Sequence, residues 1–244
     1  MRPVARGASP RPSDFKDYAH AKPELVSRLG PYCSFCERRI PVMLAVEHIQ
    51  PKGLPPYAHL KGRWDNFLLA CVNCNSTKGD RDVVLADHLI PDRDNTFAAY
   101  EYPMDGTMRP APGLAGPASA AAHATWALVG LDKPVSVTLD INGNAVALDR
   151  VSQRKEAWLV ALDVSADLRQ QPQNEALRRA AVRTAILTGF FSIWMAAFAH
   201  DLDMRQRLIA AFPWTAAGGC FDPVTTAPVQ PAPNPDGLPD GGKL

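Results

Sequence analysis

Residues 33–81 read CSFCERRIPVMLAVEHIQPKGLPPYAHLKGRWDNFLLACVNCNSTKGDR, and the rest of the chain is interpreted around this stretch. A Cys-x-x-Cys pair stands near each end of it, Cys33 with Cys36 and Cys71 with Cys74. Two such pairs suit a tetrahedral zinc site, in which each pair gives two thiolates to one ion. Four thiolates leave no position open for water, so the Zn²⁺ is expected to be structural.

Other uses of the cysteines fit the sequence less well. A redox Cys-x-x-Cys needs only one pair and a βαβ context. The opening residues, MRPVARGASPRPSDF, lack the apolar segment of a secretory signal, so a cytoplasmic location is expected and lasting disulfides are not. The fifth cysteine, Cys220, is interpreted as a small buried apolar residue.

Between the two pairs, the sequence predicts a strand, a long loop, a second arm and a helix. Residues 42–49 are apolar and β-branched and run into Gln50-Pro51, which is typical of a strand that enters a loop. Residues 64–70 lead into the second cysteine pair. A short helix is expected from Asn75 onward, with Asn75 or Ser76 as its cap.

This stretch resembles the HNH endonuclease family, the ββα-metal nucleases, in its zinc-bearing form. The resemblance covers about a fifth of the chain and rests on several spaced motifs that agree at once. They are the first cysteine pair, Glu47-His48-Ile49-Gln50-Pro51-Lys52, Asn66, and the run from Cys71 through Cys74-Asn75 to Lys78-Gly79.

The resemblance implies phosphodiester hydrolysis and assigns the site residues. His48 is the expected general base, because imidazole titrates near neutral pH and accepts a proton from water. Glu47 and Asn75 are expected to bind a catalytic Mg²⁺ or Mn²⁺ through hard oxygen ligands, with Glu47 binding directly or through water. Asn66 takes the position at which the family's asparagine holds the loop that orients the histidine. Two alternatives stay open, in which Asn75 is only a helix cap and Asn66 an ordinary turn residue.

Charge favours a nucleic acid as the substrate. Residues 28–81 contain eight Lys or Arg residues against four acids, in a chain whose net charge is only +1. Lys52, Lys78 and Arg81 are the expected phosphate contacts, although a solvated basic face is the plain alternative. DNA is the favoured substrate, and RNA is not excluded by any motif. No run of eighteen uncharged apolar residues occurs, so no membrane span is expected.

The whole chain predicts an α+β protein in which a zinc-stapled ββα-metal core precedes a mostly helical C-terminal domain with a β-hairpin. The predicted divisions are an N-terminal arm and short helix at 1–30, the nuclease core at 31–110, the helical domain at 111–221 and a disordered Pro/Gly-rich tail at 222–244. Hairpins are expected at 97–108 and, with Asn142-Gly143 as the turn, at 135–148. Residues 174–200 are expected to form one long helix.

A narrower resemblance concerns the chain as a whole. The nuclease motifs, an Asp-Gly hairpin and a helical tail that ends in Phe212-Pro213-Trp214-Thr215 are similar to the PtuB-like HNH subunits of Septu-type antiphage defence systems. This resemblance implies an ATPase or another defence-system protein as partner and an antiphage effector role. An oligomer is expected if both strands of a duplex are cut at once. The alternative function is a non-catalytic zinc module that binds nucleic acid or protein.

Overall fold

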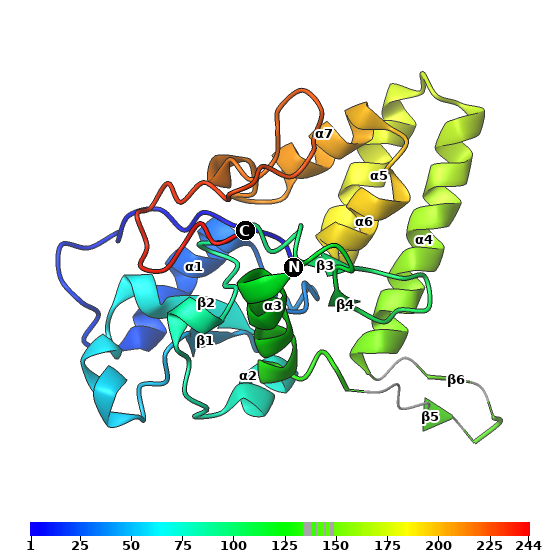
Figure 1. Ribbon diagram of the computed structural model, residues 1–244. Helices are drawn as coiled ribbons and strands as arrows, with labels where there is room; N and C mark the ends of the chain where they lie inside the picture. Colours follow the sequence, from blue (N-terminus) through cyan, green and yellow to red (C-terminus); the bar gives the residue numbers. More distant parts are fainter. Residues whose placement is uncertain (134–137, 140, 144, 147–148) are drawn as a thin grey trace.

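The computed structural model describes residues 1–133, 138–139, 141–143, 145–146 and 149–244 (Figure 1). The chain has the predicted α+β class, with three small two-stranded sheets and a helical C-terminal part. The α-helices are α1 (Lys22–Leu29), α2 (Val72–Lys78), α3 (Gly116–Leu128), α4 (Arg150–Gln170), α5 (Glu175–Thr188), α6 (Phe191–Ala197) and α7 (Leu202–Ala211). The short 3₁₀ helices are η1 (Tyr18–Ala21), η2 (Pro55–Leu60), η3 (Trp64–Asn66), η4 (Leu85–Asp87) and η5 (Ala216–Gly218).

The nuclease core is a strand pair followed by a helix. Strand β1 (Ala45–His48) pairs antiparallel with β2 (Phe67–Ala70), and the register sets Glu47 opposite Leu68 and His48 opposite Phe67. All four residues of β2 are buried because α1 packs against this strand. The α2 helix follows directly and lies against β1, so strand, strand and helix form one compact unit.

The α2 helix begins earlier than the sequence predicted. Its N-cap is Cys71, whose sulfur accepts a hydrogen bond from the Cys74 amide. Asn75 therefore lies inside the helix, and the alternative in which Asn75 serves only as a cap is wrong. The physical reason is that the second cysteine pair itself forms the first turn of the helix.

Two hydrophobic clusters divide the interior. The first gathers residues from the start of the chain, both cysteine pairs, the strand pair and α3. The second gathers α4 to α7 around Trp194, Phe191 and Phe198. Because α3 packs with the first cluster, the apolar packing of the nuclease half extends to Leu131, beyond the boundary predicted after residue 110.

The long helix predicted over residues 174–200 is two helices, α5 and α6, with a break between them. Gly189 has a φ of 78° and Phe190 a φ of 55°, so the chain passes through the left-handed region here. The loop that carries Cys33 and Cys36, the first cysteine loop, packs against this break. Gly189 forms a β-bridge with Arg38, and the Phe190 amide donates a hydrogen bond to the Glu37 carbonyl at 3.0 Å. The apolar pattern alone did not reveal the break, because apolar residues continue from α5 through Gly189 into the buried α6 helix.

The strands of the hairpin predicted at 97–108 are shorter than predicted. Strand β3 (Tyr100–Glu101) pairs with β4 (Arg109–Pro110) around the predicted Asp-Gly turn. Strand β5 (Thr138–Leu139) pairs with β6 (Ala145–Val146) around Asn142-Gly143. The outer parts of the hairpin predicted at 135–148 lie outside the described residues.

The terminal segments are packed, in contrast to the flexible arm and disordered tail that the sequence predicted. Arg6 is buried and lies 2.7 Å from the Asp92 carboxylate. Near the other end, the Leu244 carbonyl accepts a hydrogen bond from the Ala232 amide at 2.7 Å, and Lys243 lies 3.4 Å from Asp94. Both segments thus pack against residues 90–96. Among the described residues, no helix has the length and apolar character needed to cross a bilayer.

Candidate active site and metal centre

The four paired cysteines lie together in the first hydrophobic cluster. Their sulfur atoms are all within 4.8 Å of one another and all four residues are buried. The Cys36 and Cys71 sulfurs are 3.7 Å apart. A zinc ion with Zn–S bonds of about 2.3 Å holds tetrahedral sulfurs about 3.8 Å apart, so the cluster fits this ion closely. Hydrogen bonds among the four thiols lower the pKa of Cys71, whereas burial and hydrogen bonds raise the pKa of Cys33 and Cys74.

The helical half of the chain also reaches this centre. Arg150, the first residue of α4, places Nη1 3.2 Å from the Cys74 sulfur. Arg38 follows the first pair and donates to the Asn73 side chain on α2 at 2.8 Å. Four thiolates around one Zn²⁺ carry two excess negative charges, which such guanidinium groups offset. No local sequence pattern predicts the contact of Arg150 with the cysteine cluster, because 75 residues lie between it and Cys74.

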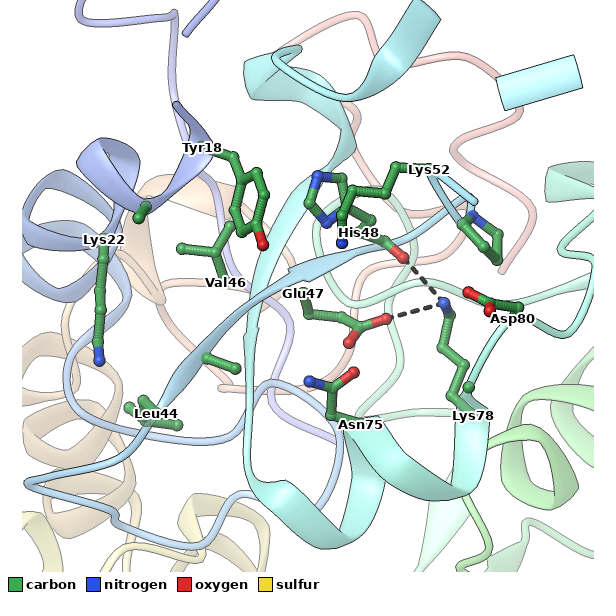
Figure 2. Close-up of a pocket in the computed structure, with 14 residues that line it drawn as sticks. Tyr18, Lys22, Leu44, Val46, Glu47, His48, Lys52, Asn75, Lys78 and Asp80 are labelled. Atoms are coloured by element: carbon green, nitrogen blue, oxygen red, sulfur yellow. Dashed lines mark hydrogen bonds and ion pairs between the residues drawn. The ribbon is translucent and has the colours of Figure 1, made fainter. Parts of the chain in front are cut away.

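The predicted catalytic residues meet in a cleft of about 340 Å³ beside the metal centre (Figure 2). Its walls come from β1, from α2 and from the η1–α1 segment, which supplies Tyr18 and Lys22. Glu47, His48 and Asn75 all line it. The cleft therefore brings together Glu47, His48 and Asn75, which the sequence motif predicted to be neighbours.

Glu47 is buried and paired with a cation. Lys78 Nζ lies 2.8 Å from Glu47 Oε1 and donates to the His48 carbonyl at 2.8 Å. Burial raises the pKa of Glu47, and the nearby ammonium of Lys78 opposes that rise. Lys78 is itself only 3% exposed, so its predicted role as a surface phosphate contact does not match its position in this structure. Lys78 is buried because it ends α2 and its side chain points inward over β1.

Asn75 projects from α2 toward Glu47 on β1, and Figure 2 shows the two side chains facing each other. Within the described part of the cleft, no hydrogen bond joins the Asn75 amide to a neighbour. A carboxylate and a free amide oxygen form a hard donor pair that suits Mg²⁺ or Mn²⁺. The residues present therefore fit a hard divalent ion in their chemistry, with the Lys78 ammonium as a competing cation.

His48 leaves β1 on the opposite side from Glu47, as consecutive strand residues do (Figure 2). Its ring packs edge-on between Tyr18 and Phe67, with centroid distances of 4.8 and 5.1 Å. Nε2 lies 3.0 Å from the Lys61 carbonyl. A carbonyl only accepts, so Nε2 carries the proton and Nδ1 of the neutral ring keeps its lone pair. Burial lowers the pKa of His48 to about 4, so the imidazole is neutral near pH 7.

Asn66 closes the loop that follows the histidine. Its Oδ1 accepts from the Gln50 amide at 2.8 Å, and its Nδ2 donates to the Gln50 carbonyl at 2.9 Å. The Ile49 amide in turn donates to the Asn66 carbonyl. These bonds fix the chain where it leaves β1, so Asn66 is placed to position His48 rather than to react.

The other two predicted phosphate contacts, Lys52 and Arg81, lie in different places. Lys52 lines the cleft, with Nζ 4.7 Å from the Tyr18 ring centroid. Arg81 lies outside the cleft lining and points to the last carbonyls of α3, Ala127 and Leu128. Its predicted phosphate contact is not supported by this position. Sequence reasoning missed Tyr18, Lys22 and Asp80 in the cleft wall, and the first two precede the motif in a segment that carries no motif of its own.

A strand pair, a helix and four clustered cysteines thus surround one cleft that is lined by a carboxylate, a histidine and an asparagine. Residues 33–81 match the family model described as HNH endonuclease. This segment is an HNH endonuclease domain, and its chemistry is the hydrolysis of phosphodiester bonds in nucleic acid. Such nucleases generally act with a divalent metal ion. A comparison with curated proteins found no match for the chain.

Proposed function

We propose that the protein is a metal-dependent HNH endonuclease that hydrolyses phosphodiester bonds in DNA. The single observation that carries the proposal is the cleft in which Glu47, His48 and Asn75 share a wall beside the four-cysteine cluster. Zn²⁺ bound to Cys33, Cys36, Cys71 and Cys74 has a structural role. A Mg²⁺ or Mn²⁺ ion held by Glu47 and Asn75 supplies charge neutralisation at the phosphate and at the leaving oxygen.

The residues of the chain perform the proton chemistry and the positioning. His48 Nδ1 takes the proton from the attacking water while the water oxygen forms its bond to phosphorus. The bond from phosphorus to the leaving oxygen then breaks, and that oxygen departs with the electron pair. The Lys61 carbonyl stabilises the imidazolium by accepting from Nε2, and Asn66 holds the loop so that the ring keeps its orientation. Lys52 is free to contact a neighbouring phosphate.

The decisive experiment is cleavage of plasmid DNA by the His48→Ala variant in Mg²⁺ and in Mn²⁺. The rate is expected to fall by at least about 100-fold, because general-base catalysis of this kind contributes that much. Zinc content by elemental analysis and the far-UV spectrum are expected to stay unchanged. The matched control is His88→Ala, because His88 lies outside the cleft lining and its ring bonds to the Val84 carbonyl in the preceding turn. Metal-dependent cleavage at the wild-type rate in His48→Ala contradicts the proposal.

We further propose that this nuclease is a cytoplasmic antiphage effector governed by a partner, an ATPase or another component of a defence system. Support comes from the resemblance to PtuB-like subunits, and the reduced state of the cysteines fits the cytoplasm. Phage plaque counts on cells that carry the chain with its genomic neighbours test the idea. Protection is expected to need both the neighbour and His48, and it is contradicted if the neighbour has no effect. Light scattering of the complex measures whether an oligomer forms.

One observation favours a second function, a non-catalytic zinc module that binds nucleic acid or protein. Lys78 already neutralises Glu47, so the free protein lacks an open carboxylate. This function predicts DNA binding without cleavage in every divalent metal, with and without the partner. Cleavage that depends on His48 rules it out.

A further inference from the structure

The ammonium group of Lys78 occupies the position in front of the carboxylate that the proposed catalytic ion needs. It lies 2.8 Å from Glu47 Oε1, and a second contact of 2.8 Å to the His48 carbonyl fixes it at two points (Figure 2). The two side chains are only 3% and 2% exposed. Water therefore screens this pair very little. The Lys78–Glu47 contact is a buried ion pair of the cleft and not a transient ion pair at the surface.

A divalent ion and this ammonium compete for the Glu47 carboxylate, whose Oε1 the ammonium already contacts. A bound Mg²⁺ or Mn²⁺ requires a carboxylate oxygen at about 2.0–2.2 Å, and an ammonium hydrogen already points at Oε1. Two cations beside one buried carboxylate also repel each other strongly, because charges interact more strongly where water is excluded. Joint occupation is therefore unfavourable, and one cation must leave before the other binds.

The cleft offers the displaced group another position. Lys78 has a flexible stem of four carbons, and Asp80 lies beside it in the same wall (Figure 2). The Asp80 side chain is exposed, so an ammonium that moves toward it regains both a carboxylate partner and water. Movement of a single side chain is thus sufficient to open Glu47.

We propose that Lys78 is an internal counter-cation that a divalent ion must displace from Glu47. The free protein consequently binds Mg²⁺ and Mn²⁺ weakly, and metal loading is coupled to movement of the Lys78 ammonium out of the cleft floor. The inference rests on the proposed function, since it takes Glu47 as a ligand of the catalytic ion.

The test is a titration of the full zinc-loaded chain with Mn²⁺, followed by electron paramagnetic resonance without any nucleic acid. Lys78→Met keeps the stem and removes the charge, and it is expected to bind Mn²⁺ at least tenfold more tightly than the wild type. Lys155→Met is the matched control, because Lys155 is exposed on α4 and lies outside the cleft lining, and less than a threefold change is expected. Glu47→Gln is expected to lose the tight site.

The outcomes separate the two ideas. If Glu47→Gln weakens Mn²⁺ binding but Lys78→Met binds no tighter than the wild type, the metal site stands and the counter-cation inference is overturned. If no variant changes Mn²⁺ binding, Glu47 is not a ligand, and both the inference and the proposed metal site fall.

A measurement on the unmodified protein covers the case in which Lys78→Met does not fold. Acetic anhydride labels accessible lysine amines, and peptide mass spectrometry reports the labelled fraction at Lys78. Saturating Mn²⁺ is expected to raise the labelling rate of Lys78 at least fivefold, with Lys155 on the outer surface of α4 as the internal reference. An unchanged rate at Lys78 under Mn²⁺ overturns the inference.

Discussion

The imidazole of His48 sits among aromatic rings and three lysines, and this environment disfavours its protonated form. Burial is the main cause of the lowered pKa of about 4, and the charges of Lys52, Lys78 and Lys61 act in the same direction. The hydrogen bond to the Lys61 carbonyl opposes the shift, because it becomes stronger when the ring is charged. The residue is therefore kept as a proton acceptor over the whole neutral range.

This pKa predicts how stability depends on pH. The unfolded chain protonates His48 near pH 6.5, whereas the folded chain does so only near pH 4. The stabilisation from the neutral ring is therefore fully present above pH 6.5 and is lost as the pH falls toward 4. Between pH 6.5 and 5, the wild type is expected to lose on the order of 1 kcal/mol more of its free energy of unfolding than His48→Gln. Urea denaturation at each pH, with zinc present, measures this difference, and parallel curves for the two proteins contradict it.

At the level of single residues, sequence spacing predicted that the four cysteines form one cluster, because each Cys-x-x-Cys is a local structure. The neighbourhood of His48, Glu47 and Asn75 followed from the resemblance. The pairing of Lys78 with Glu47 could not be predicted, since 31 positions separate them and only the packing of α2 on β1 brings them together. The same limit applies to Tyr18, which reaches His48 from outside the motif.

At the scale of secondary-structure elements, the junction between α5 and α6 depends on Gly189. A Cβ atom added to Gly189 lies 2.8 Å from both the Arg39 amide nitrogen and the Glu37 carbonyl oxygen, and the φ of 78° disfavours any other residue. Gly189→Ala is therefore expected to lower the free energy of unfolding by about 2–4 kcal/mol, through strain and loss of contact with the cysteine loop. Chemical denaturation measures the loss.

Gly113→Ala is the matched control for this substitution. Nothing lies within 4 Å of a Cβ atom added there, and its backbone is not in the left-handed region. Its effect is expected to stay within about 0.5 kcal/mol. Equal effects of the two substitutions contradict the role assigned to Gly189.

The helix boundaries show what sequence periodicity can and cannot predict. The α4 helix begins at a local feature, because the Asp149 side chain accepts hydrogen bonds from the Val151 and Ser152 amides at its N-terminus. The break at Gly189 was missed because the Phe, Trp and Met residues around it are buried on all sides and give no clear period. Local preference does not report which distant loop docks against a helix end.

Over the whole molecule, the four-cysteine cluster lies where residues 33–81 contact the start of α4, through Arg150 and Cys74. Removal of zinc with a strong chelator, or Cys71→Ala, is expected to lower Tm by at least about 10 °C, because metal binding to such a site contributes directly to folding. Elemental analysis is expected to find one zinc ion per chain. Hydrogen exchange is expected to rise in the first cysteine loop and at the starts of α4 and α6, while α7 serves as the reference. An unchanged Tm after verified zinc loss contradicts a structural role.

The overall architecture was predictable and the terminal segments were not. Proline and glycine content describes local backbone preference, and it led to the prediction of a loose arm and tail. In the folded chain, Arg6 and Lys243 instead make ion pairs with Asp92 and Asp94, so tertiary contacts override the composition. The division of the chain into residues 31–110 and 111–221 stays a prediction.

Glu37 is the neighbour of Cys36, and its carboxylate receives the Ser192 amide at 2.7 Å and the Ser192 hydroxyl at 2.6 Å at the start of α6. Glu37 therefore links the first cysteine pair directly to the start of α6. If zinc holds this cluster, a chain made under zinc starvation is expected to lose the contact with Ser192, to expose the aromatic interior of its second half and to become a substrate for proteolysis. The amount of folded enzyme in a cell then follows the supply of zinc, although zinc takes no part in the hydrolysis.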